Sequence, residues 1–174
     1  MTTHPGRALV TCPCDRRWLL LLALVATAAC GRPRSPADEA ADMERSRCGP
    51  DVDEAQLSPL FDGSAIDRVE ALQEDVTSAD YLVVHDEVLG AVIFVRAMKG
   101  VTPEWLDRAL ECHSARRVLG RVADIPGDPF WLPGRTVSID VRSARDELRV
   151  EVRGDTQADG EAILARARAF VGTP

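Results

Sequence analysis

Thr136-Val-Ser-Ile-Asp-Val-Arg142 and Glu147-Leu-Arg-Val-Glu-Val-Arg153 are the two stretches that decide the fold of this chain. In each of them apolar and polar residues alternate, so every second side chain lies on the same face of an extended strand. The two stretches therefore predict a β-hairpin with one buried face and one solvated face. We expect the charges of the solvated face to form cross-strand ion pairs rather than a binding strip. These charges are Arg142, Arg149 and Arg153 with Asp140, Glu147 and Glu151.

A helix is predicted upstream of this hairpin. Thr102-Pro103-Glu104 supplies an N-cap, a proline at the first helical position and an acid in the first turn, and Gly120 is expected to end the helix. Its residues form two adjoining stripes, one of Trp105, Ala109, Cys112 and Arg116 and the other of Leu106, Leu110, His113 and Arg117.

A second helix is predicted to close the domain. Thr156 and Asp159 form a capping box there, and the helix behind it has an apolar face of Ile163, Ala167, Phe170 and Val171.

The loop 121–134 between the first helix and the hairpin is rich in proline and glycine, which indicates a rigid connection. Its apolar centre, Phe130-Trp131-Leu132, is expected to pack under the sheet. Phe130 and Trp131 are nevertheless the candidate residues for an interaction site, with core packing of Trp131 as the simpler alternative.

Two further strands are predicted at residues 81–85 and 90–97, which are rich in β-branched and aromatic residues. Asp86-Glu87-Val88-Leu89 lies between them. Residues 64–72 are ambiguous, because Ser64 and Asp67 could form a capping box before a helix, yet the same residues fit an irregular strand.

The predicted order is therefore strand, strand, helix, strand, strand, helix. This ββαββα order indicates an α+β fold with two β-hairpins and two helices. We expect an antiparallel sheet with the helices on one face, similar to a ferredoxin-like fold after circular permutation.

Residues 1–29 are predicted to be a lipoprotein signal peptide. Arg16 and Arg17 provide a basic region, Leu19 to Val25 an apolar region, and Thr27-Ala-Ala the small residues before Cys30. The apolar run is too short to span a membrane.

We expect Cys30 to receive acyl chains such as palmitate and to anchor the protein; the alternative is ordinary secretion, with Cys30 kept as a thiol. Gly31 after Cys30 resembles the pattern of outer-membrane sorting, so we expect a location at the outer membrane facing the periplasm.

Residues 30–56 are rich in proline, alanine and acids, and they predict a flexible tether ahead of a single α+β domain at 57–174. A short helix from Ala37 to Arg45 is the alternative for part of this segment.

The charge of the chain argues against a nucleic-acid partner. It has 21 Lys and Arg against 28 Asp and Glu, with a net charge of −7, and removal of the signal would take away more arginines than acids. Nucleic-acid binding needs clustered basic residues, and here they are scattered among acids.

The cysteines predict a disulfide. Cys12 and Cys14 would leave with the signal, and acylation of Cys30 would leave Cys48 and Cys112 as a pair in an oxidising compartment. The alternative is two unpaired thiols.

The Cys112-His113 pair is also the sharpest candidate for chemistry, because thiolate and imidazole both bind metals. Adjacent helical residues point about 100° apart, however, so both cannot readily hold one ion. A metal or ligand site of Cys112, His113 and His85 is kept as the alternative. We expect no cofactor and no catalytic group, and the acids Asp86, Glu87, Asp124 and Asp128 are interpreted as solvated loop residues.

Residues 100–117, Gly-Val-Thr-Pro-Glu-Trp-Leu-Asp-Arg-Ala-Leu-Glu-Cys-His-Ser-Ala-Arg-Arg, together with Gly90 to Ala97, resemble a group of uncharacterised myxobacterial envelope proteins and predicted lipoproteins. The shared pattern is Gly-x-Thr-x-Glu-Trp-Leu followed by Cys-His and Ala-Arg, and the likeness covers residues 64–171. Those proteins carry Cys-Pro in the loop after the helix, where this chain has Asp128-Pro129. The resemblance thus leaves Cys48 as the partner of Cys112, and it implies an envelope location without implying an activity.

The sequence as a whole favours a non-enzymatic, lipid-anchored envelope protein that contacts the membrane through its anchor and binds an unidentified envelope protein. The competing hypothesis is the small metal- or ligand-binding protein described above.

Overall fold

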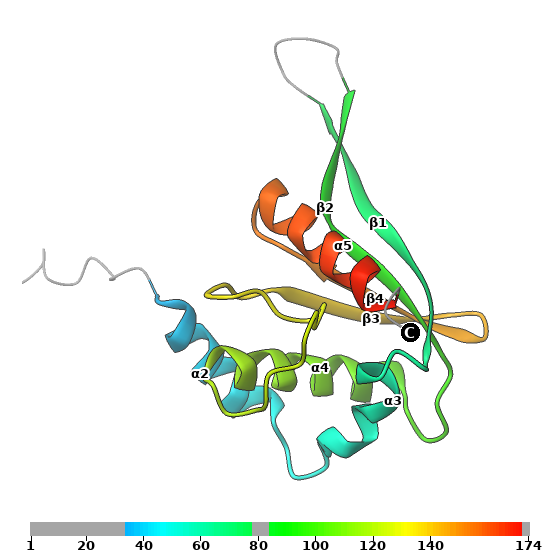
Figure 1. The fold of residues 1–174 in the computed structure, drawn as a ribbon. Helices are drawn as coiled ribbons and strands as arrows, with labels where there is room; N and C mark the ends of the chain where they lie inside the picture. The colour runs from blue at the N-terminus through cyan, green and yellow to red at the C-terminus, as the bar shows by residue number, and fades with distance from the viewer. Residues whose placement is uncertain (1–33, 78–83, 172–174) are drawn as a thin grey trace, which may run out of the picture. The chain divides into compact units, whose positions relative to one another are not determined.

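The computed structural model describes residues 34–77 and 84–171, which belong to one compact unit, Arg34–Pro174 (Figure 1). The elements in chain order are α2 (Pro36–Arg47), the 3₁₀ helix η1 (Glu54–Leu57), α3 (Ser58–Phe61), β1 (Ile66–Thr77), β2 (Val84–Arg96), α4 (Pro103–Val118), β3 (Ser138–Ala144), β4 (Glu147–Arg153) and α5 (Gln157–Val171). From β1 onward the order is ββαββα, so the predicted α+β class and element order are confirmed.

The described strands form one antiparallel sheet in the order β1-β2-β4-β3. A ferredoxin-like βαββαβ sheet has its first and third strands at the centre, with the fourth strand beside the first and the second beside the third. Moving its last strand to the front gives ββαββα with the second and fourth strands at the centre. This is the observed order, so the strand order is that of the predicted permutation.

The first hairpin differs from the prediction in which residues form it. Residues 86–89 do not separate two strands but continue β2, which runs from Val84 to Arg96. Its partner is β1, formed by the segment that the sequence left ambiguous between helix and strand. The interpretation of Asp86 and Glu87 as loop acids is therefore wrong, because both lie within β2 and pair with β1.

The first of two irregularities in β1–β2 pairing explains why residues 66–72 have a helix-like pattern. The register shifts between Ile66 and Arg68, so Ile66 and Val69 both face the main core although they are three residues apart. Leu72 instead joins a small cluster on the opposite face. A bulge adds one residue to a strand and interrupts its period of two, so the apolar spacing imitated that of a helix.

The main core contains inward residues of the sheet together with residues of helices α4 and α5. Helix α4 contacts β3, whereas α5 contacts β2 and β1. Residues of both helices belong to the same buried cluster as the inward residues of the sheet, although the predicted placement of both helices on one face stays a prediction. The cluster includes Ile93, Val95, Val150, Val152, Ile139 and Val141 from the sheet, Leu106 and Leu110 from α4, and Ile163 and Leu164 from α5.

Two glycines allow backbone segments to approach closely. A Cβ atom at Gly90 of β2 would lie 1.9 Å from the carbonyl oxygen of Val152 in β4. A Cβ atom at Gly160 of α5 would lie 2.4 Å from the carbonyl oxygen of Val88 and 2.7 Å from the Cα atom of Leu89 in β2. The first turns of α5 thus rest directly on the backbone of β2, beside the second irregularity of its pairing with β1.

The predicted flexible tether at 30–56 is wrong for its described part. Pro36–Arg47 is a helix with a capping box, in which Ser35 accepts a hydrogen bond from the Asp38 N–H, so the alternative of a short helix is confirmed. This helix, α2, packs against α4 and has Ala40 fully buried. The folded unit therefore begins about twenty residues earlier than the predicted boundary at 57.

Several predictions fall on residues outside the described ranges. The signal peptide at 1–29, the proposed acylation of Cys30 and the predicted strand residues 81–83 lie there. Within residues 34–77 and 84–171, no helix has the length and apolar character needed to cross a membrane.

Candidate functional site

The neighbouring residues Cys112 and His113 point in different directions from α4. The sulfur of Cys112 is bonded to Cys48, which follows α2, with the two Cα atoms 5.1 Å apart. His113 Nε2 lies 2.9 Å from a carboxylate oxygen of Asp128 in the loop after α4. The predicted disulfide is therefore confirmed, and the alternative of two unpaired thiols is wrong.

The alternative metal site is wrong for Cys112, which cannot act as a ligand while its sulfur is in the disulfide. His113 is buried, and its Nε2 bonds to Asp128. The backbone of His85 is part of β2, but its side chain lies outside the described part of the structure. Among the described residues there is no group of three His, Cys, Asp or Glu side chains with the geometry of a metal site.

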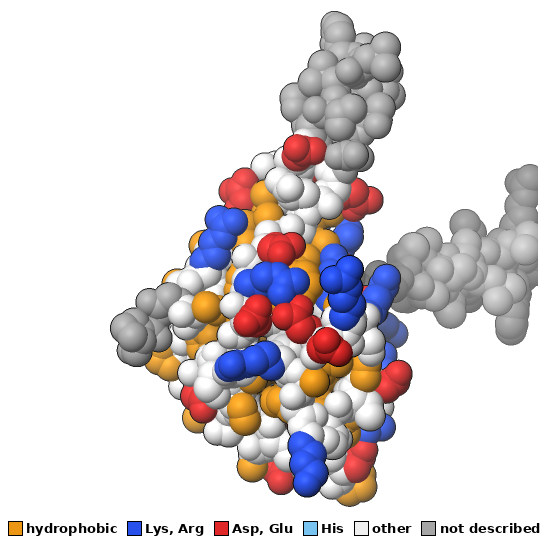
Figure 2. All heavy atoms as spheres, turned by 90° about the vertical axis from the view of Figure 1, so that its right-hand side faces the viewer, with side chains coloured by type: hydrophobic (Ala, Val, Ile, Leu, Met, Phe, Trp, Pro, Cys, Tyr) orange, Lys and Arg blue, Asp and Glu red, His pale blue; other side chains and the backbone are white. Residues whose placement is uncertain are grey.

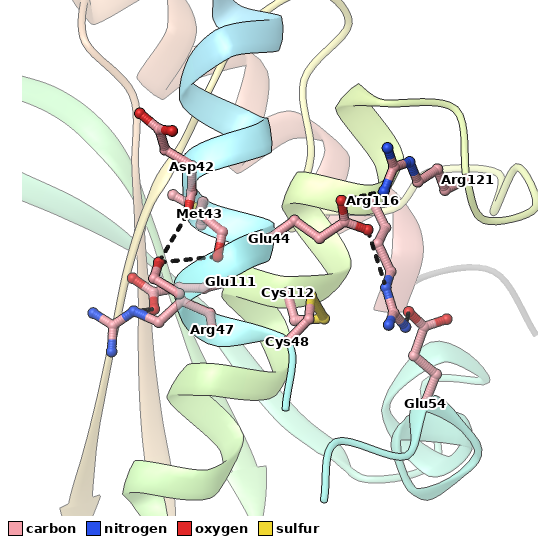
Figure 3. Close-up of a disulfide and its surroundings, with 11 residues drawn as sticks. Asp42, Met43, Glu44, Arg47, Cys48, Glu54, Glu111, Cys112, Arg116 and Arg121 are labelled. Atoms are coloured by element: carbon pink, nitrogen blue, oxygen red, sulfur yellow. Dashed lines mark hydrogen bonds and ion pairs between the residues drawn. A yellow bond between two sulfur atoms is a disulfide. The ribbon is translucent and has the colours of Figure 1, made fainter. Parts of the chain in front are cut away.

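Ion pairs surround the disulfide and join α2 to the rest of the domain (Figure 3). Glu44 of α2 binds Arg121 and lies 3.8 Å from Arg116, while Arg47 Nε lies 2.7 Å from a carboxylate oxygen of Glu111 on α4. Only Ala40 of α2 is buried, so the helix has little apolar surface of its own. The disulfide and these ion pairs therefore supply most of its attachment.

Asp128 is the centre of a second cluster, which is fully buried. One carboxylate oxygen accepts a hydrogen bond from the Phe130 N–H at 2.9 Å, and the other lies 2.9 Å from His113 Nε2 and 3.5 Å from Arg117 Nε. Arg166 of α5 donates from Nε to the Asp128 carbonyl oxygen at 2.9 Å. The cluster thus joins α4, the following loop and α5 through one carboxylate and its backbone.

The two aromatic interaction candidates have different environments. Phe130 is fully buried in the core, so its assignment as an interaction residue is wrong. Trp131 is half-buried, with the guanidinium carbon of Arg117 4.3 Å and that of Arg166 5.6 Å from its ring centroid. Because both guanidinium groups make cation–π contacts with this ring inside the domain, the structure favours an internal packing role for Trp131.

The His113–Asp128 pair is not placed for acid–base catalysis. His113 is 1 % exposed, and the Phe61 ring covers it at 4.4 Å between centroids. Phe61 also lines a groove of about 330 Å³ with Asp62, Pro126, Gly127, Ala169 and Phe170, and His113 and Asp128 do not line it. A general base must reach the proton that it removes from a substrate, and the buried His113 does not line this groove. The geometry therefore indicates that His113 and Asp128 stabilise the fold.

Two acids of α4, Asp107 and Glu111, lie one turn apart beside β3 and α2. Burial raises the pKa of Asp107, and Arg47 and a hydrogen bond from the Val141 N–H oppose this rise. Burial also raises the pKa of Glu111, and the ion pair with Arg47 offsets the rise only in part. The folded protein therefore favours the protonated forms of both acids more than the unfolded chain does.

This pKa shift makes Asp107→Asn a stabilising substitution at neutral pH. The preference for protonated Asp107 stabilises the fold below about pH 4 and is lost as the pH rises through the raised folded pKa. Asparagine removes the buried charge and can still accept the Val141 N–H. We expect the melting temperature at pH 7 to rise by about 1 to 2 °C, and the difference to disappear below about pH 4.

Thermal unfolding followed by circular dichroism at several pH values measures this effect. Asp146→Asn, at an exposed turn residue, is the control and should leave the melting temperature unchanged. A less stable Asp107→Asn variant at pH 7 would show that the Asp107 charge stabilises the fold.

The solvated face of the sheet carries interleaved charges, and Figure 2 shows acidic and basic side chains alternating on one face with hydrophobic atoms between them. The prediction of cross-strand pairs within the β3–β4 hairpin is wrong. Like charges lie opposite each other there, Arg142 opposite Arg149 and Asp140 opposite Glu151. The pairs instead run along each strand, Arg142 with Asp140 and Arg149 with Glu151.

Strand β1 supplies the cross-strand partners on this face. Arg68 binds Glu147 at 2.8 Å, and Arg153 binds Glu74 at 3.1 Å. The Arg68 guanidinium also lies 3.5 Å above the ring centroid of Phe94. Charged side chains therefore cover the small apolar cluster of Leu72, Val92 and Phe94.

Asp128 is the site residue that the sequence analysis placed wrongly. Asp128 was expected to be solvated, yet it is fully buried, whereas Asp124 in the same loop has a side chain that is 81 % exposed. The sequence contains one signal for this difference. Asp128 directly precedes Pro129-Phe130-Trp131, and its carboxylate accepts the N–H of Phe130 two residues later, as in an Asx turn.

Comparison with known proteins gives no family for this chain. No family model matches it, and neither the curated proteins nor the solved structures contain a significant match.

Proposed function

We propose that this chain is a non-enzymatic, lipid-anchored protein of the cell envelope whose folded unit binds another envelope protein. The anchor is an acylated Cys30, exposed after removal of residues 1–29, and the location is the periplasmic face of the outer membrane. The resemblance to myxobacterial envelope proteins is part of this proposal.

The Cys48–Cys112 disulfide is the observation that carries the proposal. Disulfides persist in oxidising compartments such as the periplasm and are rare in the cytosol. This one joins a helix with little apolar surface to the core of the domain, so it has a structural use. The disulfide supports export of the chain from the cytosol. The signal-like sequence before Cys30 supports anchoring of the exported chain to the membrane.

A binding role is favoured over catalysis by the state of the reactive side chains. Cys112 is oxidised and fully buried, and His113 is buried under Phe61 and bonded to Asp128. The excess of acids over basic residues favours a protein partner over nucleic acid.

Labelling with a palmitate analogue, followed by membrane fractionation, tests the anchor in cells that express the full chain. The chain should be labelled and sediment with membranes, and Cys30→Ser should abolish both properties. Cys14→Ser changes a cysteine that leaves with the signal and should have no effect. Label that persists in Cys30→Ser, or a reduced chain found in the cytosol, would contradict the proposal.

A further inference from the structure

The two edges of the sheet differ in how their backbone groups are satisfied. Strand β3 lies at one edge, where α4 packs against it and the Asp107 carboxylate accepts the Val141 N–H. Strand β1 lies at the other edge and is 12 residues long, and no described element pairs with its outer side. A free edge of this length is a template for pairing with another strand.

We propose that β1 is a self-association edge, at which two copies of this chain pair their β1 strands antiparallel across a two-fold axis. The proposal rests on the binding role inferred above and names the partner as a second copy of this chain. The β1–β1 pairing would join the two four-stranded sheets into one continuous sheet. A two-fold axis requires that the strand be complementary to itself.

The charges of β1 are compatible with a register centred at Ala71, and this is the register that the proposal names. Residues opposite each other in an antiparallel pair point to the same face of the sheet, so their positions in β1 differ by an even number. The two-fold axis must therefore pass between the two copies of a single β1 residue. With the axis at Ala71, Arg68 lies opposite Glu74 of the second copy, and the one like-charge pair in the strand is Asp67 opposite Asp75, next to it. An axis at Glu70 would place two Glu70 side chains together, and an axis at Leu72 would place Glu70 opposite Glu74.

The register at Ala71 also continues the ion pairs within each chain. Glu74 binds Arg153, and Arg68 binds Glu147, on the solvated face of the sheet. Pairing of Arg68 with Glu74 across the axis would produce a row of alternating charges, Arg153, Glu74, Arg68 and Glu147, running from one chain into the other. Two such rows would form, and added salt should weaken them.

Cysteine crosslinking tests both the edge and its register. Ala71→Cys would bring the Cβ atoms of two cysteines to about 4.5 Å across the axis, at the upper end of the range that a disulfide spans. Gln73→Cys is the matched control, because position 73 is on the same face of the strand but lies opposite Val69. Its two copies would be about 13 Å apart along the strand, which is too far for a disulfide.

The measurement uses the full chain in cells, with non-reducing gels of isolated membranes and with the unsubstituted chain as the baseline. Ala71→Cys should give at least about tenfold more covalent dimer than Gln73→Cys, and low salt should increase the yield. In the Cys30→Ser background, where the gels are run on the soluble fraction because this variant should not sediment with membranes, the ratio should be the same, so the result does not depend on acylation. An equal yield from both variants, no dimer in either, or a crosslink from the Ala71→Cys variant to a different protein would overturn the proposal.

Discussion

Reduction of the Cys48–Cys112 disulfide is expected to lower the free energy of unfolding by about 4 kcal/mol. The bridge closes a loop with a sequence separation of 64 residues, and the chain-entropy relation gives about this value for such a length. Helix α2 should be the first element to detach, because only Ala40 of its residues is buried. The melting temperature should fall by about 10 °C or more.

Denaturant unfolding of the oxidised and the reduced protein measures this loss without changing a side chain. The Cys48→Ala and Cys112→Ala single variants and the double variant are the controls. Each variant should have a free energy of unfolding close to that of the reduced protein. Cys112→Ala should lower it further than Cys48→Ala, because Cys112 is fully buried and Cys48 only partly. A difference below about 1 kcal/mol between the oxidised and reduced protein would show that packing on α4 and ion pairs hold α2 without the disulfide.

Asp128→Ala is expected to lower the free energy of unfolding by about 3 to 5 kcal/mol. The substitution leaves the buried Phe130 N–H without its acceptor and removes the nearest buried carboxylate from Arg117, whose side chain is 5 % exposed. Asp128→Asn keeps an acceptor for Phe130 and should cost less, about 1 to 2 kcal/mol.

Asp124→Asn is the matched control for this prediction. Asp124 also binds Arg117, but its side chain is 81 % exposed, so the loss should stay below about 1 kcal/mol. Urea unfolding of the three variants and the wild type would separate the effects. A stability of Asp128→Ala within about 1 kcal/mol of the Asp124→Asn value would mean that burial does not distinguish the two acids.

The parts of the fold that were predicted correctly are those whose signals are local. Helix α4 begins at Pro103, where the Thr102 side chain accepts the Trp105 N–H, and α5 begins after Thr156, which caps Asp159 in the same way. The β3–β4 hairpin follows from strict alternation. Each of these signals depends on contacts within a few residues.

The parts that were missed depend on contacts between distant segments. Strand β1 was ambiguous because its register shifts are set by pairing with β2. Helix α2 resembled a tether because its attachment comes from Cys112, Glu111 and Arg121, which lie far along the chain. The burial of Asp128 likewise requires α4 and α5 on either side of its loop, which no local pattern reports.

The close approaches at Gly90 and Gly160 define what a distant relative of this protein would have to retain. Any side chain at either position would overlap backbone atoms of a neighbouring strand, so substitution there demands a rearranged sheet rather than a repacked side chain. Surface charges and even the cysteine pair can change over evolution while the chain path is preserved. A search for homologues should therefore give these two glycines more weight than the conspicuous Cys112-His113 motif.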